Sequence, residues 1–338
     1  MVELFMQYLL WPLLKIIVVV LFLVLMVMAM TLAERKVIAH IQVRLGPMRV
    51  GWHGVLQPIA DMVKLLMKED IIPLKADRPV FILAPILVAI PAFLVFSVIP
   101  FGPEPFFIAD INVGILFILA VSSIGVLAIL LGGWSSNSKY PFMGGLRASA
   151  QMISYEVPMG LAIVSVLLMT KSLSLVSIVQ WQQQSGWWLF AIQPVAFVIY
   201  YICGIAETNR CPFDLPEAEN ELVGGFHTEY SGIRFAFFFL AEYINMITIS
   251  CLTVVLFLGG WLRPFPGISW LGFLDYVPPV VWFLLKTCFF LYLYLWIRGT
   301  FPRYRFDQLM GIGWKWFLPI TLANIIGTAG ALLFYYYR

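Results

Sequence analysis

The sequence predicts an all-α polytopic membrane protein, with about eight transmembrane helices and one amphipathic helix at the membrane surface. Its 338 residues are 62% hydrophobic and 12% charged, and its mean hydropathy is +0.92. Soluble globular domains carry roughly a quarter charged residues. The apolar residues gather in segments of the ~20 residues that a helix needs to cross a bilayer. These segments lie near residues 9–32, 79–100, 113–133, 148–169, 188–206, 234–261, 277–297 and 314–336.

The first apolar run, from Ile16 to Met30, lacks a basic region before it and leads into Glu34-Arg35-Lys36. A cleaved signal peptide is therefore not expected, and the run is interpreted as an uncleaved first span. No short repeat and no low-complexity segment divides the chain. We therefore expect a single transmembrane domain over residues 1–338.

Basic residues are distributed unevenly between the alternate loops. Sixteen Lys and Arg residues lie on the side that holds the loops near 33–78, 134–147, 207–233 and 298–313. The positive-inside rule places these loops in the cytoplasm and both chain termini on the outer side. The other side holds only Lys15, Lys171, Arg263 and Arg338.

The loop between the first two spans contains a helical pattern from Val55 to Lys68. Its apolar face carries Leu56, Ile59, Val63, Leu66 and Met67, and its polar face carries Gln57, Asp61, Lys64 and Lys68. This segment is too short to span, so it is predicted to lie in the membrane interface. Taken alone, a lipid-surface anchor is the simpler interpretation.

An acidic segment joins the fifth and sixth spans. It places six of the eighteen Asp and Glu residues within the 23 residues from Glu207 to Glu229. Charge held in hydrocarbon costs a few kcal/mol per residue, so this segment must lie at the interface, line a water-filled cavity or be covered by a partner. Pro212 and Pro216 argue against a continuous helix. We therefore expect a shaped acidic loop.

Four ionisable residues fall within or at the ends of four successive spans: Glu156, Glu207, Glu242 and Lys286. A single acid in a membrane is often a hydrogen-bonded structural residue. Four on successive spans favour an ion or proton route. The third span contains no acid, so a route through it needs water, a partner, or hydroxyls such as those of Ser122 and Ser123.

Other kinds of site find little support in the sequence. The four cysteines have no Cys-x-x-Cys spacing and no clustered histidines beside them, so metal, flavin or iron–sulfur binding by this chain is not expected. No glycine-rich nucleotide-binding motif is present. The net charge of +3 reflects basic residues that favour anionic lipid, and nucleic acid is not a predicted partner.

Several short motifs, distributed from the first span to the last, resemble the quinone-tunnel membrane subunit of respiratory complex I. This family comprises the H subunit of bacterial NADH-quinone oxidoreductase and subunit 1 of the mitochondrial enzyme. The motifs are Ala33-Glu-Arg-Lys36, Arg44-Leu-Gly-Pro47, Leu56-Gln-Pro-Ile-Ala-Asp61, Ser149-Ala-Gln-Met-Ile-Ser-Tyr-Glu156, Ala206-Glu-Thr-Asn-Arg-Cys-Pro-Phe-Asp214, Glu221-Leu-Val-Gly-Gly-Phe226 and Asp307-Gln-Leu-Met310.

The resemblance implies a subunit of a proton-pumping NADH:quinone oxidoreductase in the bacterial cytoplasmic membrane. Ubiquinone or menaquinone would be its substrate, reaching a chamber near an iron–sulfur cluster held by a soluble neighbour. The implied partners are soluble iron–sulfur subunits docked on the cytoplasmic loops, antiporter-like membrane subunits and membrane lipid. No complete active site is expected on this chain alone.

The resemblance also implies roles for individual residues. Those for the tunnel and its loops are Glu34, Arg35, Asp61, Arg210, Asp214, Glu217, Glu219, Glu221, Phe226, Arg298 and Arg303. Glu156, Glu207, Glu242 and Lys286 would form the proton route.

Three other functions remain open from the sequence. Membrane subunits of hydrogenases and of other quinone-linked complexes share much of this pattern. A stand-alone proton-coupled transporter would also use acids within its spans. A passive membrane anchor would explain the loops but not the buried charges.

Overall fold

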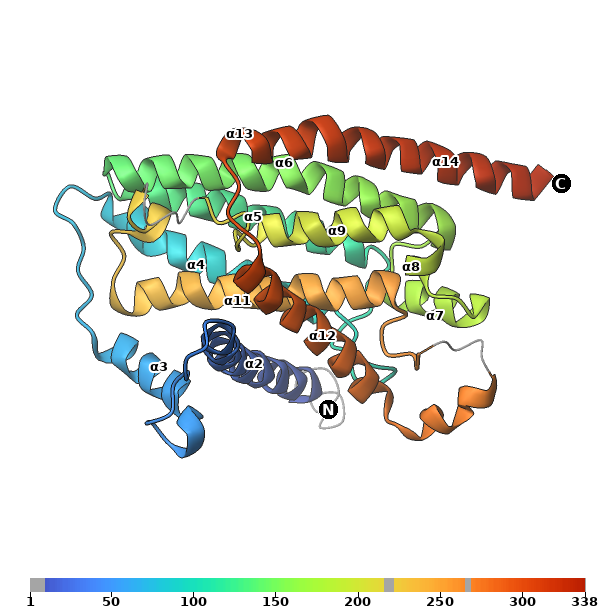
Figure 1. Ribbon diagram of the computed structural model, residues 1–338, viewed down its shortest axis with the longest axis horizontal. Helices are drawn as coiled ribbons and strands as arrows, with labels where there is room; N and C mark the ends of the chain where they lie inside the picture. The colour runs from blue at the N-terminus through green and yellow to red at the C-terminus, as the bar shows by residue number, and fades with distance from the viewer. Residues whose placement is uncertain (1–9, 216–221, 265–268, 338) are drawn as a thin grey trace.

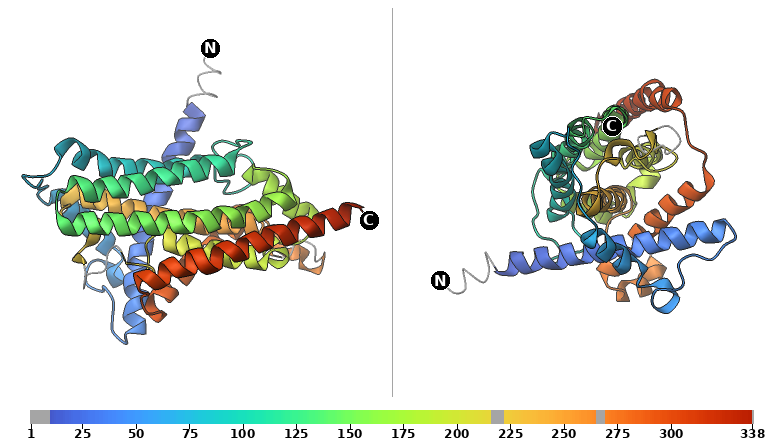
Figure 2. Two further views of the ribbon diagram at one scale, coloured as in Figure 1. Left: turned by 90° about the horizontal axis from the view of Figure 1, so that it is seen from above. Right: turned by 90° about the vertical axis from the view of Figure 1, so that its left-hand side faces the viewer.

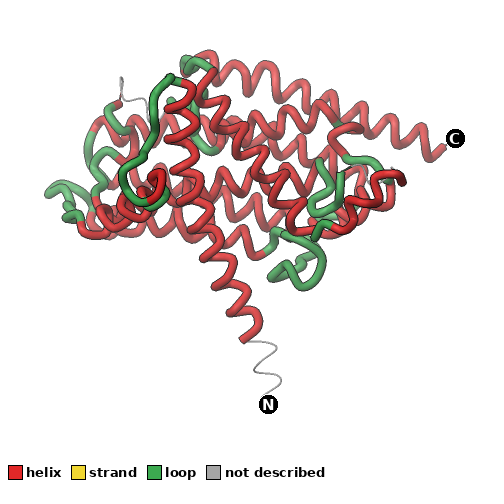
Figure 3. The backbone as a smooth tube through the Cα atoms, turned by 60° about the horizontal axis from the view of Figure 1, so that its bottom comes forward, coloured by secondary structure: helices red, strands yellow, loops and turns green. Residues whose placement is uncertain are grey.

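The computed structural model describes residues 10–215, 222–264 and 269–337. Over these ranges the chain is helical and contains no strand, which confirms the predicted all-α class (Figure 3). The α-helices are α2 (Trp11–Ile41), α3 (Gln57–Met67), α4 (Arg78–Leu94), α5 (Gly114–Ser135), α6 (Lys139–Thr170), α7 (Leu175–Ser185), α8 (Leu189–Ile192), α9 (Pro194–Glu207), α11 (Gly232–Phe257), α12 (Pro279–Thr300), α13 (Phe306–Gly311) and α14 (Leu318–Tyr337). Short 3₁₀ turns occur at η2 (Trp52–Gly54), η3 (Val95–Ser97), η4 (Gly225–His227) and η5 (Ser269–Tyr276), and a π-helical turn, η6 (Ile312–Phe317), joins α13 to α14.

Seven described helical segments are long and apolar enough to cross a membrane, and each corresponds to one predicted span. The segment predicted at 188–206 differs, because it divides into α8 and the 14-residue α9. Pro194 explains the break. Proline has no N–H, and its ring disfavours helical geometry at the preceding residue. Gln193 accordingly has φ −124° and ψ 57°.

The predicted loop at 134–147 is largely helical, because α6 begins at Lys139. Glycines let α5 and α6 approach closely at this point. A Cβ atom on Gly133 would lie 2.5 Å from the Pro141 carbonyl oxygen, and small residues of this kind are common where membrane helices meet. The loop predicted at 298–313 is also partly helical, since α12 continues to Thr300 and α13 follows.

Helices α4, α5, α6 and α9 pack in succession, and α14 lies along α6 (Figure 1). Helix α11 packs against α4, α9 and α12 and is the central helix, with 78% of its most apolar stretch buried. The corresponding values are 17% for α2 and 11% for the segment containing α14. Figure 2 shows α2 crossing the other helices at a steep angle. Helices α2 and α14 therefore present most of their apolar surface to lipid or to partners.

The amphipathic helix predicted over Val55–Lys68 is present as α3, which lies against α2 and α11. The segment that follows it is tied to the start of α11. Arg234 pairs with Asp70 at 3.1 Å, and Ser231 Oγ accepts a hydrogen bond of 3.0 Å from the Ile71 N–H. These contacts fix the position of α3 relative to α11.

Tyr230 anchors the same region to α5. Burial raises its pKa to about 12, so the hydroxyl stays protonated at neutral pH. It donates to the Gly132 carbonyl at 3.4 Å and lies 3.3 Å from Ser135 Oγ. Its ring stacks on Phe81 of α4 with centroids 4.0 Å apart. The start of α11 is therefore attached to both α4 and α5.

Candidate functional site

Five charged or polar side chains from four segments meet near the C-terminal end of α2. Arg210, in the turn after α9, lies 3.2 Å from Glu34 of α2 through Nη1 and pairs through Nε with Glu242 of α11. Arg298 of α12 also pairs with Glu34. The Tyr243 hydroxyl donates to Glu34 Oε2 at 2.5 Å. The structure thus brings together Glu34, Arg210, Glu242 and Arg298, all of them candidate site residues from the sequence.

The turn that carries Arg210 is held by Gln151 of α6. Its amide donates to the carbonyl oxygens of Ala206 and Phe213, both at 2.8 Å. The Arg210 guanidinium lies 4.4 Å from the centre of the Tyr243 ring. A buried cation is costly unless carboxylates and oriented dipoles surround it. The two carboxylates, the aromatic face and the fixed turn provide that environment.

These side chains line a cavity of about 540 Å³, called here the charged chamber. Four of its ionisable groups belong to the cluster, and Arg35 and Arg44 add two further cations. The lining residues are Thr31, Glu34, Arg35, Ile38, Arg44, Pro47, Arg210, Phe239, Glu242, Tyr243 and Arg298.

A second cavity of about 510 Å³ adjoins the charged chamber and lies between α2, α3 and α11. We call it the apolar cavity, because Val, Leu, Ile, Met and Phe side chains form most of its wall. Thr31, Arg35 and Phe239 line both spaces. Arg35 Nη1 bonds Asp61 Oδ2 of α3 at 2.5 Å near this junction. Helix α3 is therefore a wall of a cavity as well as a surface helix.

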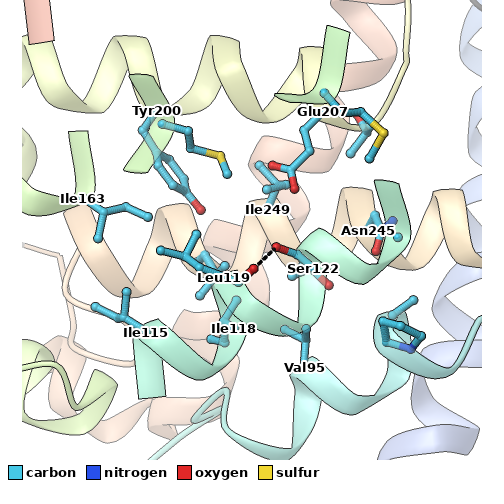
Figure 4. A pocket seen from close by; sticks show the side chains of 18 of the residues that line it. Val95, Ile115, Ile118, Leu119, Ser122, Ile163, Tyr200, Glu207, Asn245 and Ile249 are labelled. Carbon is cyan, nitrogen blue, oxygen red and sulfur yellow. Dashed lines mark hydrogen bonds between the residues drawn. The ribbon is translucent and has the colours of Figure 1, made fainter. Parts of the chain in front are cut away.

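Two smaller cavities continue from the charged chamber into the bundle. The first, of about 130 Å³, is lined by Phe239 and Glu242, and also by Glu207 and Asn245. The second, of about 50 Å³, is again lined by Glu207 and Asn245 and reaches Ser122. Figure 4 shows Glu207 and Tyr200 pointing from α9 toward α5 and α11. Neighbouring cavities thus share lining side chains, so the four cavities adjoin one another.

Glu207 is the least satisfied acid along this series. Its Oε2 atom is buried and has no hydrogen-bond partner among the residues that the structure describes. The carboxylate of Glu156, on α6, lies close enough to interact with it electrostatically. A buried carboxylate oxygen without a donor must be met by water or carry a proton. The position is therefore suited to holding an exchangeable proton.

Asp214 and Arg303 join the acidic loop to the segment after α12. Their side chains lie 3.2 Å apart, and the Tyr304 N–H donates to the Pro212 carbonyl at 3.2 Å. Burial, and next the Asp214 carboxylate, raise the pKa of the Cys211 thiol, while Arg303 lowers it. The described part of the loop is thus fixed to the start of α13. Glu217, Glu219 and Glu221 lie outside the described residues.

Phe226 lies apart from the charged chamber and lines the first of the two smaller cavities, beside His227. Its ring contacts Phe238 of α11 with centroids 5.4 Å apart. The segment that follows the acidic loop, which contains η4, therefore forms one wall of this smaller cavity.

Lys286 lies apart from the acids of this region. Its ammonium donates to three carbonyl oxygens beyond the end of α11, those of Leu258 (2.7 Å), Gly260 (3.1 Å) and Leu262 (2.7 Å). It also lies 4.6 Å from the centre of the Trp188 ring. These contacts describe a cap on the C-terminus of α11. A role for Lys286 in a proton route stays a prediction.

Replacing Lys286 with Gln should lower the midpoint of thermal unfolding of the chain within its complex, by several degrees. The amide cannot supply three donors to the three carbonyls, and unsatisfied buried carbonyls cost about 1–3 kcal/mol. Lys171→Gln, at the end of α6, is the matched control. A loss of proton pumping at an unchanged midpoint would instead favour the proton route.

Sequence patterns did not reveal three residues that line two or more adjoining cavities, namely Thr31, Phe239 and Asn245. A threonine or a phenylalanine in a span looks like ordinary membrane-facing or core sequence. The available signal was spacing, because Thr31 and Phe239 each lie three residues before a cluster acid, Glu34 or Glu242, and so share its helix face.

The fold and site define a class: a polytopic helical membrane protein with an ion-pair cluster in a cavity that adjoins an apolar one. Residues 14–329 match the NADH dehydrogenase family. The chain is 53% identical to an H subunit of NADH-quinone oxidoreductase from Geobacter metallireducens, covering 96% of both sequences. It is 51% identical to an H subunit of the same enzyme from Rhizobium meliloti, covering 92% of this chain and 94% of that protein. The chain belongs to the NADH dehydrogenase family, as its motifs predicted.

Proposed function

We propose that this chain is a membrane subunit of a proton-pumping NADH:quinone oxidoreductase and forms the passage by which quinone reaches its reduction site. The observation that carries this proposal is the junction between the apolar cavity and the charged chamber. Thr31, Arg35 and Phe239 line both spaces. A quinone has an apolar isoprenoid tail and a headgroup with two hydrogen-bond acceptors. The two spaces offer this molecule an apolar wall followed by cationic donors.

The chamber supplies charge and protons, and a partner supplies electrons. Reduction of a quinone to a quinol consumes two electrons and two protons. The electrons come from an iron–sulfur subunit docked beside this chain. Arg210 and Arg298 favour the build-up of negative charge on a headgroup near them. That charge competes with Glu34 and Glu242 for the same guanidinium groups, so a change in redox state alters the ion pairs of both acids.

Glu242 connects this event to the interior of the membrane. It lines the charged chamber and the first smaller cavity, and Glu207 lines that cavity and the next. We place Glu242, Glu207 and Glu156 in that order on a proton route. Water and the Asn245 and Ser122 side chains would bridge the intervals between the acids. Ser122 thereby offers a hydroxyl from the acid-free α5 beside Glu207.

The distribution of basic residues sets the proposed orientation. The loops at 33–78 and 298–313 face the cytoplasm of a bacterium, where soluble iron–sulfur subunits dock, and both chain termini lie outside. Antiporter-like membrane subunits would continue the proton route beyond Glu156. Ubiquinone and menaquinone both fit, because an apolar wall accepts any isoprenoid tail.

Membership of the NADH dehydrogenase family argues against a stand-alone transporter and against a passive anchor. Purification in mild detergent tests this directly. A member of a redox complex will co-purify with several partners and with iron–sulfur absorbance, whereas a transporter will run alone. Recovery of hydrogenase activity instead of NADH oxidation would assign the chain to a related complex.

Replacing Arg35 with Ala, or Asp61 with Asn, should lower the rate of NADH-driven quinone reduction roughly two- to fivefold. The pair joins α2 to α3 beside the junction, and a partly exposed ion pair contributes about 0.2–1 kcal/mol. NADH-driven reduction of ferricyanide, which accepts electrons before quinone, should stay at the wild-type rate. Arg305→Ala is the control, because Arg305 is 79% exposed and pairs with Asp307 away from both cavities. An equal loss of both activities would indicate failed assembly, whereas wild-type quinone reduction in both variants would contradict the proposed passage.

A further inference from the structure

A separate cavity of about 750 Å³ lies at the other end of α2. The first half of α2, the connector between α4 and α5, and the start of α12 form its walls. We call it the Lys15 cavity, because Lys15 is the one ionisable side chain among the described residues that line it. They are Trp11, Leu14, Lys15, Val18, Val19, Phe22, Phe101, Pro105, Phe106, Phe107, Ile108, Val280 and Leu284.

Two helices place this cavity far from the charged chamber. On α2, Lys15 and Glu34 are nineteen positions apart, which corresponds to roughly 28 Å along the helix axis. On α12, Val280 and Arg298 are eighteen positions apart, which corresponds to roughly 27 Å along the helix axis. The Lys15 cavity shares no lining residue with the charged chamber and lies toward the other end of a helix long enough to cross a membrane, so it is not an extension of the quinone passage.

The cavity is open on its apolar side. Val18 is 56% exposed and Phe106 is 53% exposed, so an apolar molecule in the surrounding membrane can reach the wall laterally. Its volume is within the range of sites that hold small organic molecules. In a bilayer the surrounding apolar molecules are lipid acyl chains.

Lys15 gives the cavity a positive polar end. Its Nζ donates to the Phe107 carbonyl oxygen at 3.1 Å, which fixes the ammonium against the connector. An ammonium has three donors, so two remain for a ligand. Two acids lie on the same connector but outside the lining: Glu104 is exposed, and Asp110 accepts a hydrogen bond from Ser174 at 2.9 Å. The Lys15 ammonium at the polar end of the cavity suits the phosphate group of a phospholipid, and the apolar walls suit its acyl chain.

We propose that the Lys15 cavity binds one anionic phospholipid of the leaflet opposite the charged chamber, with its phosphate on Lys15 and an acyl chain between α2 and α12. The lipid would cover the exposed apolar wall of α2. Helix α2 also carries Glu34 and Arg35, so the lipid would brace the end of the helix opposite the chamber.

Photolabelling of the whole complex in phosphatidylcholine vesicles tests this site. Two probes carry the same photoreactive acyl chain, one on phosphatidylglycerol and the other on phosphatidylcholine. The phosphatidylglycerol probe should label peptides spanning residues 11–22 or 101–108 about fivefold more, since a basic residue near anionic lipid contributes about 1 kcal/mol. Lys15→Gln should remove that preference, and Lys171→Gln, a cation outside this lining, should keep it.

Val18→Trp provides a second arm, because the indole fills the apolar wall and leaves Lys15 in place. It should lower labelling of both peptides by both probes. Equal labelling by the two probes, or a preference that survives Lys15→Gln, would overturn the anionic headgroup. Absence of labelling with either probe would show that another protein of the complex covers this face, and would overturn the lipid site itself.

Discussion

Replacing Arg210 with Met is expected to lower NADH-driven quinone reduction on the order of 100-fold, equivalent to about 3 kcal/mol. Methionine fills much of the same space but removes the cation that pairs with Glu242, and leaves Glu34 with Arg298 and the Tyr243 hydroxyl. Removing one member of a buried ion pair is costly because the remaining charge has no counterpart. Arg210→Lys should recover part of the activity, since one ammonium cannot pair with both carboxylates in the geometry of a guanidinium.

Stability and activity must be separated in this experiment. Combining Arg210→Met with Glu242→Gln removes the unpaired negative charge of Glu242. The double variant should therefore regain thermal stability without regaining quinone reduction. Arg263→Met is the matched control. Arg263 is also largely buried and pairs with Asp275 at 3.1 Å, outside the charged chamber. Near-normal quinone reduction in Arg210→Met would refute a role for this cluster in the reaction.

Replacing Glu242 with Gln is expected to abolish proton pumping or block turnover, whereas Glu242→Asp should retain a measurable fraction of both. Gln keeps the volume and much of the hydrogen bonding but cannot release a proton. Asp keeps a titratable group at a shorter reach. Glu156→Gln and Glu156→Asp should follow the same order if that residue lies on the route. Quinone reduction and pumping are measured together in reconstituted vesicles.

A purely structural acid would give the opposite order. Gln would then be tolerated better than Asp, because hydrogen bonding and shape would matter more than the proton. Wild-type pumping in Glu242→Gln would remove this residue from the route. Ser97→Ala serves as a control, because the Ser97 side chain is only partly buried, lines none of the four cavities, and donates to the Leu94 carbonyl at 2.7 Å.

Much of the fold could be predicted from hydropathy, because each long apolar segment must form a helix to satisfy its backbone in lipid. The ends of the helices could not. Helix α6 begins nine residues earlier than expected, since glycine contacts between α5 and α6 stabilise a polar helical turn that composition assigns to a loop. The division at Pro194 was signalled by proline itself.

The ion-pair cluster depends on distances that hydropathy does not encode. Glu34 and Arg210 are 176 positions apart, and motif resemblance named both residues without predicting their contact. Lys286 shows that sequence can also suggest a role that the contacts of the residue do not support. A charge within a span predicts a polar route, but only coordinates show that its ammonium meets backbone carbonyls. The position of Phe239 in the walls of several cavities also depends on how the helices pack, which the sequence does not show.

The shortness of α9 has a consequence for the depth of the membrane at this site. Fourteen residues rise about 21 Å, well short of the ~30 Å of hydrocarbon. Trp187, just before α8, is 65% exposed, and tryptophan favours the membrane surface, so the recessed end is the one that carries Glu207. With Trp187 at one membrane surface, the other end of α9 would fall short of the opposite headgroups, and the turn with Arg210, held by Gln151, would lie below their level. On the proposed proton route, a proton leaving the chamber would then have a shorter stretch of hydrocarbon to cross.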